Sequence, residues 1–174
     1  MRLLVGRLVT LAFAVVVAGL EPVPVLAQHR HQMPGMPMEE TKSAAPYHPH
    51  LGELMTAFVQ PRHTKLGLAG EAQNWAYAAY ELDELREAFG DIETLVPKHG
   101  DLSIPEAVGA TVKQPLEALA AAIAAKDAAA FNQAYAALTD GCNACHRSAG
   151  HAMIVIQVPR ASPYPDQDFR PQAK

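Results

Sequence analysis

An apolar stripe near the C-terminal end of this chain runs into both of its cysteines. The stripe repeats at intervals of four, three, four and three residues, and it consists of Phe131, Tyr135, Leu138, Cys142 and Cys145. This spacing places all five side chains on one face of a helix. The helix is expected to start at the N-cap Asp127 and to end at Gly150. The two thiols therefore face neighbouring elements.

Two segments that precede this helix also show helical patterns. The first is expected over about 49–69, with a kink at Pro61. The second is expected over 71–89, with Gly90 as its stop. Their apolar faces consist of Leu51, Leu54, Met55, Phe58, Val59 and Leu66 in the first segment, and of Trp75, Ala78, Leu82, Leu85 and Phe89 in the second.

A further helix is predicted between these segments and the cysteine-bearing one. Ser103 and Glu106 match a capping box at its start. Pro115 lies inside the pattern and predicts that this helix is not straight. Its inward face is expected to hold Val108, Val112, Leu116, Leu119 and Ile123.

The predicted fold is all-α. No alternating apolar and polar run indicates a sheet between residues 50 and 150. Four helices joined mostly by short connections favour an antiparallel up-down-up-down four-helix bundle over this range. The last two helices are rich in alanine, so the centre of such a bundle needs another group to fill it.

The N-terminal segment predicts export. Arg2 and Arg7 precede an almost wholly apolar run over residues 8–20, and small or tolerated residues lead up to Ala27. This pattern is typical of a signal peptide over residues 1–27, cleaved near Ala27; an uncleaved membrane anchor is the alternative. We expect a periplasmic protein without stable membrane insertion after cleavage. The net charge of −4 and the pI of about 6.0 argue against nucleic-acid binding.

Two segments flank the predicted bundle. Residues 28–49 form a leader with side chains that suit copper, although a low-complexity linker with the same composition is the alternative. These side chains are His29, His31, Met33, Met36 and Met38. Residues 151–174 form a Pro-rich tail that is expected to be extended on the surface or disordered, apart from an apolar run at 154–158 that should pack against the protein.

The pentapeptide Cys142-Asn143-Ala144-Cys145-His146 matches the attachment sequence of c-type haem. Two thiols three residues apart can each bond one haem vinyl group, and the adjacent histidine can bind the iron. A thioredoxin-like redox pair fits less well, because the dipole near a helix C-terminus raises a thiol pKa. Zinc would need further ligands at matching spacing. The sequence therefore predicts one covalently attached haem c.

A four-helix bundle with this pentapeptide near the end of its last helix resembles the class II cytochromes c, which include the cytochromes c-prime and their low-spin relatives. The resemblance covers about residues 50–150. It implies that His146 binds the iron, and it leaves a homodimer as an option. Ala149 and Gly150 depart from the aromatic-basic pair that cytochromes c-prime commonly carry at these positions.

The sixth iron ligand is predicted to be Met55. In an antiparallel bundle the start of the first helix lies beside the end of the last, and low-spin class II cytochromes are similar in placing a Met ligand on the first helix. The alternatives are His63 and no protein ligand. His63 is expected at the far end of the bundle, near Asn74 and Trp75, as a hydrogen-bonded structural residue. Further haem contacts are predicted from Tyr135 and Leu138.

The expected function is transfer of single electrons between redox partner proteins, without catalysis. A five-coordinate haem protein that binds nitric oxide or carbon monoxide, in the manner of the cytochromes c-prime, is one alternative. An exported helical protein that binds copper through its leader is another.

Overall fold

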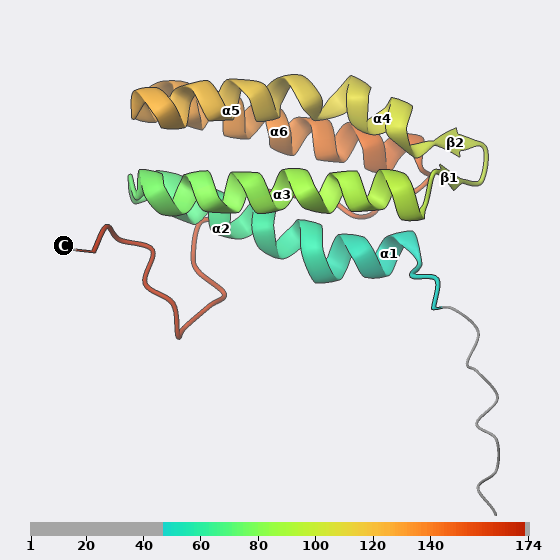
Figure 1. Ribbon diagram of the computed structural model, residues 1–174, viewed down its shortest axis with the longest axis horizontal. Coiled ribbons are helices and arrows are strands. Elements are labelled where there is room, and N and C mark those ends of the chain that lie inside the picture. Colours follow the sequence, from blue (N-terminus) through green and yellow to red (C-terminus); the bar gives the residue numbers. More distant parts are fainter. Residues whose placement is uncertain (1–46, 173–174) are drawn as a thin grey trace, which may run out of the picture. The chain divides into compact units, whose positions relative to one another are not determined.

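The computed structural model describes residues 47–172, and this part of the chain is mainly helical (Figure 1). The all-α prediction is confirmed at this level, whereas the predicted signal peptide and the leader up to residue 46 lie outside the described residues. No helix within 47–172 is long and apolar enough to span a membrane. The helical elements are α1 (Leu51–Leu54), the π-helix η1 (Met55–Val59), α2 (Gln60–Glu71), α3 (Trp75–Leu95), α4 (Ile104–Thr111), α5 (Lys113–Ala125) and α6 (Ala128–Ser148).

The elements α1, η1 and α2 follow one another without a break and form the first predicted helix. His50 is its N-cap, and the backbone N–H of His50 donates to Glu53 Oε2 at 2.9 Å. The π-helical turn lies just before Pro61, the residue at which the sequence predicts a kink; proline lacks an N–H and crowds the carbonyl four residues earlier. A π-helical turn contains an extra residue, and Phe58, predicted to face inward, is 52% exposed.

Helix α3 differs from its predicted bounds at both ends. It begins after the N-cap Asn74, whose Oδ1 accepts a hydrogen bond from the Tyr77 N–H at 3.3 Å. It runs through Gly90 to Leu95, so the predicted stop at Gly90 is wrong. The continuation is stabilised because Ile92, one half-turn beyond Gly90, is completely buried in the core.

The third predicted helix is divided into α4 and α5 at Val112. Pro115 has no N–H to donate to the Thr111 carbonyl, which explains the break. Ser103 is the N-cap of α4, but its side chain makes no capping hydrogen bond, so the predicted capping box does not form. The five predicted inward residues of this segment are buried.

A short antiparallel ladder, which sequence patterning did not predict, closes the connection between α3 and α4. It consists of β1 (Lys98–His99) and β2 (Leu102–Ser103), with Lys98 opposite Ser103 and His99 opposite Leu102. Two residues per strand are too few to show an alternating pattern, which is why the sequence carries no signal for them.

Helix α6 matches its predicted bounds closely. Asp127 Oδ1 accepts hydrogen bonds from the N–H groups of Ala129 and Ala130 at 2.9 and 3.0 Å. Gly150 follows the helix end with φ +77°, a conformation that favours glycine. The helices pack in pairs, α2 with α3 and α5 with α6, and α3 also contacts α5 (Figure 1). The largest fully buried apolar side chains are Leu66, Leu85, Ile92, Ile104, Val112, Leu119, Phe131 and Leu138.

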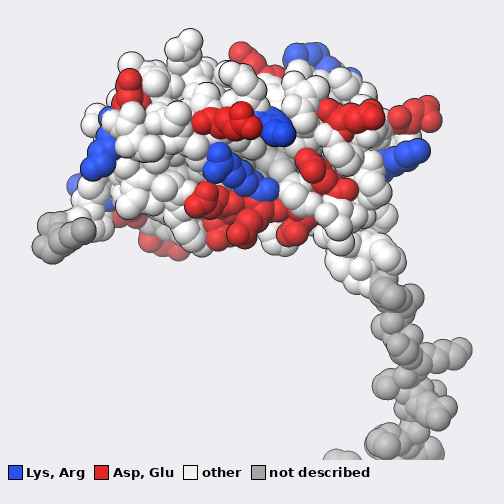
Figure 2. All heavy atoms as spheres, turned by 45° about the horizontal axis from the view of Figure 1, so that its top comes forward, with Lys and Arg blue, Asp and Glu red and all other residues white. Residues whose placement is uncertain are grey.

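Charged side chains lie on the surface of this core. Acidic and basic groups are interspersed on the face shown in Figure 2, and no continuous basic patch crosses that face. Among the acidic groups of residues 47–172, Glu81 is the buried exception, and it pairs with Arg62 at 3.4 Å. Arg62 also pairs with Glu84 at 2.7 Å.

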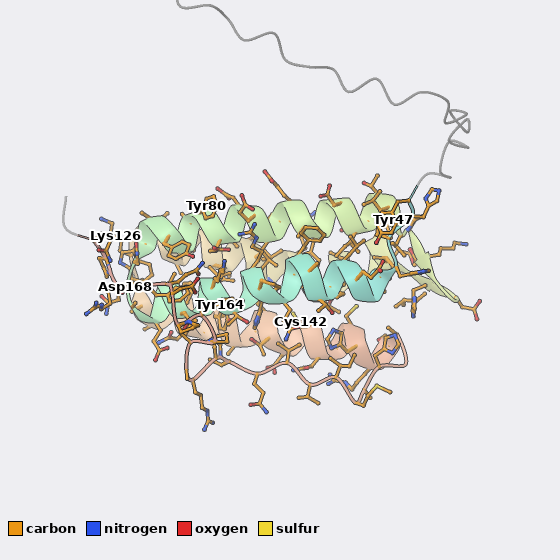
Figure 3. All side chains as sticks on the ribbon, turned by 90° about the horizontal axis from the view of Figure 1, so that it is seen from below. Tyr47, Tyr80, Lys126, Cys142, Tyr164 and Asp168 are labelled. Atoms are coloured by element: carbon orange, nitrogen blue, oxygen red, sulfur yellow. The ribbon has the colours of Figure 1, made fainter. Side chains whose placement is uncertain are left out.

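The tail after α6 is extended, as expected, and doubles back alongside α6 (Figure 3). Phe169 is buried, and its ring stacks on Tyr77 with centroids 5.5 Å apart. Lys65 Nζ lies 5.0 Å from the centre of the Tyr164 ring. The tail is therefore attached to α2 and α3 by aromatic contacts.

Candidate functional site

A cavity of about 520 Å³ lies between the first helical segment, α4, the end of α6 and the chain that follows α6. Most of its walls are apolar. Its lining includes Leu51, Met55, Val59, His63, Phe89, His99, Ile104, Val108, Cys142, Cys145, His146, Ala149, His151, Ile154, Val155 and Ile156. The structure thus brings the cysteine-histidine pentapeptide and the predicted ligand Met55 to one cavity.

The two cysteines lie one helical turn apart on α6, are half-buried, and form no disulfide. Burial, with a smaller contribution from Cys145, raises the pKa of Cys142 to about 12. Burial also raises the pKa of Cys145. Both groups are therefore protonated thiols at neutral pH, unlike the low-pKa cysteines of redox motifs. Figure 3 shows Cys142 on α6, on the side toward the first helical segment.

His146 has a defined tautomer. Its Nδ1 lies 2.8 Å from the Ile154 carbonyl oxygen. A carbonyl oxygen only accepts hydrogen bonds, so Nδ1 carries the hydrogen and Nε2 of the neutral ring keeps its lone pair. Histidines that bind metals characteristically donate from one ring nitrogen and ligate with the other. His146, which lines the cavity, is therefore prepared to act as a ligand.

The segment 151–157, which we call the strap, supplies this carbonyl and covers one side of the cavity. Asn143 holds the strap through two hydrogen bonds to the backbone of Ile156, with Nδ2 donating to the carbonyl at 2.9 Å and Oδ1 accepting from the N–H at 2.8 Å. Sequence reasoning assigned no role to Asn143. The apolar run 154–158 was expected to pack against the protein, but Ile154, Val155 and Val158 are 50%, 64% and 49% exposed, so this expectation is wrong. The run borders an open cavity, and hydrogen bonds from Asn143 hold it instead of apolar burial.

Met55 lies in η1 and is half-buried. Single π-helical turns within α-helices occur frequently at functional sites. The turn here coincides with the residue predicted to be the sixth ligand. Ligation by Met55 stays a prediction, supported by its place in the cavity wall together with His146.

The expected position of His63 is wrong. His63 lines the same cavity as His146 rather than lying near Asn74 and Trp75. His63 follows Met55 by about two helical turns. It still lines the cavity, because the cavity extends along this helical segment from Leu51 to Thr64. Burial lowers the pKa of His63 to about 4, so this ring is neutral at pH 7.

Both ring nitrogens of His63 have hydroxyl partners on α6, as expected of a structural histidine. Nε2 lies 3.0 Å from Thr139 Oγ1, and Nδ1 lies 3.0 Å from the Tyr135 hydroxyl. The Tyr135 hydroxyl also lies 2.7 Å from the His63 carbonyl oxygen, to which it can donate. Tyr135 and Leu138 are buried, but the structure places neither among the residues that line the cavity.

Two further histidines in the cavity wall were not singled out from the sequence. His99 Nε2 and His151 Nε2 are 3.3 Å apart and connect β1 with the strap. They are 52 residues apart in the chain, so no local pattern relates them. Within residues 47–172, no three His, Cys, Asp or Glu side chains form a group that could hold a metal ion.

No known protein family matches this chain, and neither a curated protein nor a solved structure is similar enough to match it. A function therefore has to be inferred from the pentapeptide and the geometry of the cavity.

Proposed function

We propose that this chain is an exported monohaem c-type cytochrome, similar to the class II cytochromes c, that carries single electrons between redox partner proteins. The observation that supports this function best is the largely apolar cavity of about 520 Å³ lined by Cys142, Cys145, His146 and Met55. A haem group needs apolar walls, two thiols at this spacing and an available imidazole nitrogen, and these residues offer all three.

In this proposal the helical segments 51–71, 75–95, 104–125 and 128–148 form an antiparallel up-down-up-down four-helix bundle. Support comes from the contacts of α2 with α3, of α5 with α6 and of α3 with α5. The connections between the segments are short, as expected for antiparallel neighbours.

Each residue at the cavity has a distinct role. The thiols of Cys142 and Cys145 are protonated and are the groups that would form thioether bonds. His146 Nε2 and the Met55 sulfur are the groups that would ligate the iron. When bound, the haem supplies a one-electron redox couple. Two strong protein ligands keep the coordination unchanged in both redox states, which suits electron transfer better than ligand binding.

The strap provides a surface at which a partner can approach the cavity. Met153, Ile154 and Val155 are 78%, 50% and 64% exposed. The cavity is lined by Ile154 and Val155 from the same segment. An exposed apolar surface beside a redox group is suited to brief contact with a partner protein. Export to the periplasm, through the signal peptide predicted over residues 1–27, belongs to the same proposal.

The first test is covalent attachment. The full chain is produced in a host that has a c-type haem-attachment system, and the denatured protein is analysed as its pyridine haemochrome. We expect one covalently bound haem per chain, none in a Cys142→Ala/Cys145→Ala double variant, and unchanged content in the control Ser148→Ala. A wild-type protein without covalent haem would overturn the proposal.

The second test identifies the sixth ligand. A bond between methionine sulfur and ferric iron gives a long-wavelength charge-transfer absorption band. We expect this band in the wild-type protein, its loss in Met55→Ala, and its retention in His63→Ala. Met153→Ala is the matched control, because Met153 is 78% exposed and outside the cavity wall.

A different outcome would select the alternative function. A high-spin spectrum of the wild-type ferric protein, unchanged by Met55→Ala, would show that no methionine occupies the sixth position. Such a site is open to nitric oxide or carbon monoxide.

A further inference from the structure

Hydrogen bonds, rather than apolar burial, hold the part of the strap that lies next to His146. Its side chains Met153, Ile154 and Val155 are at least half exposed, so apolar burial contributes little there. The two hydrogen bonds from Asn143 fix both the position and the orientation of the Ile156 backbone, because one side-chain amide pairs with the N–H and the carbonyl of the same residue.

The start of the strap is held by the end of α6. The His151 N–H donates to the His146 carbonyl at 2.7 Å, and the Ile154 N–H donates to the His151 carbonyl at 2.9 Å. Ile154, whose carbonyl accepts from His146 Nδ1, therefore lies between a turn fixed on one side and the Asn143 contact on the other. Apart from the His146 ring itself, Asn143 is the pentapeptide residue whose side chain holds the strap.

We propose that Asn143 is a positioning residue for His146. By holding Ile156 it fixes the Ile154 carbonyl, and this carbonyl orients the His146 ring and polarises its Nδ1–H. This inference rests on the proposed function, since it assigns Asn143 a part in setting the properties of the haem iron through its histidine ligand.

The electronic consequence has a definite sign. A hydrogen bond from Nδ1–H to a carbonyl makes Nε2 a stronger donor to a metal ion. A stronger donor stabilises ferric more than ferrous iron. Loss of the Asn143 contact weakens this hydrogen bond, and the midpoint potential of the haem is therefore expected to become more positive.

The chain offers a matched control for this test. Asn132 is exposed on the same helix, about three turns before Asn143. Asn132→Ala and Asn143→Ala make the same chemical change in the same helix, but only the second removes the contact with the strap. Asn143→Ser is an intermediate variant, because its neutral hydroxyl can pair with only one of the two Ile156 backbone groups and adds no charge.

The experiment measures three properties of the haem-containing proteins. These are covalent haem content by pyridine haemochrome, midpoint potential by redox titration, and hydrogen exchange of the Ile156 amide. For Asn143→Ala we expect full haem content, a more positive potential, and exchange of the Ile156 amide that is faster by about tenfold, the effect of losing roughly one hydrogen bond. Asn143→Ser should show a smaller positive shift, and Asn132→Ala should match the wild type.

The outcomes separate this proposal from the one on which it rests. Equal potentials for Asn143→Ala and Asn132→Ala would overturn the positioning role and leave the cytochrome proposal standing. Absence of covalent haem from the wild-type protein would overturn the cytochrome proposal and the positioning role with it. If Asn143→Ala does not fold, Asn143→Ser decides: a positive shift supports the role, and the wild-type potential overturns it.

Discussion

His63 is a buried imidazole whose environment permits more than one hydrogen-bond arrangement. With the hydrogen on Nδ1, the ring can donate to Tyr135 and accept from Thr139. With the hydrogen on Nε2, it can donate to Thr139 and accept from Tyr135, whose single hydrogen then no longer goes to the His63 carbonyl. Both neutral tautomers have partners for both nitrogens, which offsets the cost of burying the ring. Burial nevertheless disfavours the protonated form.

Stability is therefore expected to decrease with acidification. The pKa of His63 is about 4 in the folded protein against an ordinary value of 6.5, so between these pH values the unfolded chain binds a proton that the folded chain does not. The contribution of His63 to the free energy of unfolding is fully present above about pH 6.5 and is lost as the pH falls toward 4. It amounts to at most about 3 kcal/mol.

Urea unfolding at pH 7.5, 5.5 and 4 tests this expectation. His63→Gln should lose less free energy of unfolding over this range than the wild type does. His48→Gln, at an exposed histidine before α1, should keep the wild-type dependence. Parallel curves for the wild type and His63→Gln would contradict the assignment.

At the scale of elements, the break between α4 and α5 determines how closely α6 can approach. Thr111 has a carbonyl for which Pro115 offers no N–H, and this carbonyl lies directly against Gly141 of α6. A Cβ at Gly141 would collide with the Thr111 carbonyl oxygen. Close packing of α6 against this break therefore requires glycine at position 141, immediately before Cys142.

Two glycine substitutions are expected to have opposite effects. Gly141→Ala should lower the free energy of unfolding by about 1–3 kcal/mol, because backbone atoms must move. Gly90→Ala, in the exposed middle of α3 with nothing within 4 Å of the added Cβ, should raise it by about 1 kcal/mol through helix propensity. Chemical denaturation measures both, and destabilisation by Gly90→Ala would contradict the helical reading of that site.

Gly90 and Gly150 differ in conformation although their sequence neighbourhoods are alike. Gly150 and Gly90 both follow apolar helical patterns, and a sequence rule treats both as stops. Gly150 adopts a positive φ and follows the end of α6. Gly90 stays helical because Ile92 is buried beyond it, and that burial depends on neighbouring helices that no local window contains.

At the scale of the whole molecule, the tail connects the end of α6 with the opposite pair of helices. Asn74 Nδ2 donates to the Arg170 carbonyl at 3.2 Å, and Phe169 is buried against Tyr77. A Pro-rich sequence is thus held in place by single aromatic side chains rather than by a regular element.

Phe169 is therefore expected to contribute to global stability. Phe169→Ala should lower the free energy of unfolding by about 3 kcal/mol, the lower end of the range for buried phenylalanines. Phe58→Ala is the matched control, because Phe58 is 52% exposed, and it should cost less than about 1 kcal/mol. Equal effects in thermal and urea unfolding would show that the tail does not stabilise the helices.

The sequence by itself determined the features that depend on near neighbours in the chain. These are the helical character of most of residues 50–150, the Asp127 cap, the inward stripe of α6 and the pentapeptide 142–146. Hydrogen bonds and side-chain faces within a helix repeat over three or four residues, so neighbouring residues determine them. The expected antiparallel arrangement already predicted Met55 beside His146, but only the tertiary structure decided that His63 and the strap share their cavity and that Asn143 binds Ile156. Such contacts join residues that are distant in sequence, or that meet only after the chain has turned, and they depend on how whole helices pack.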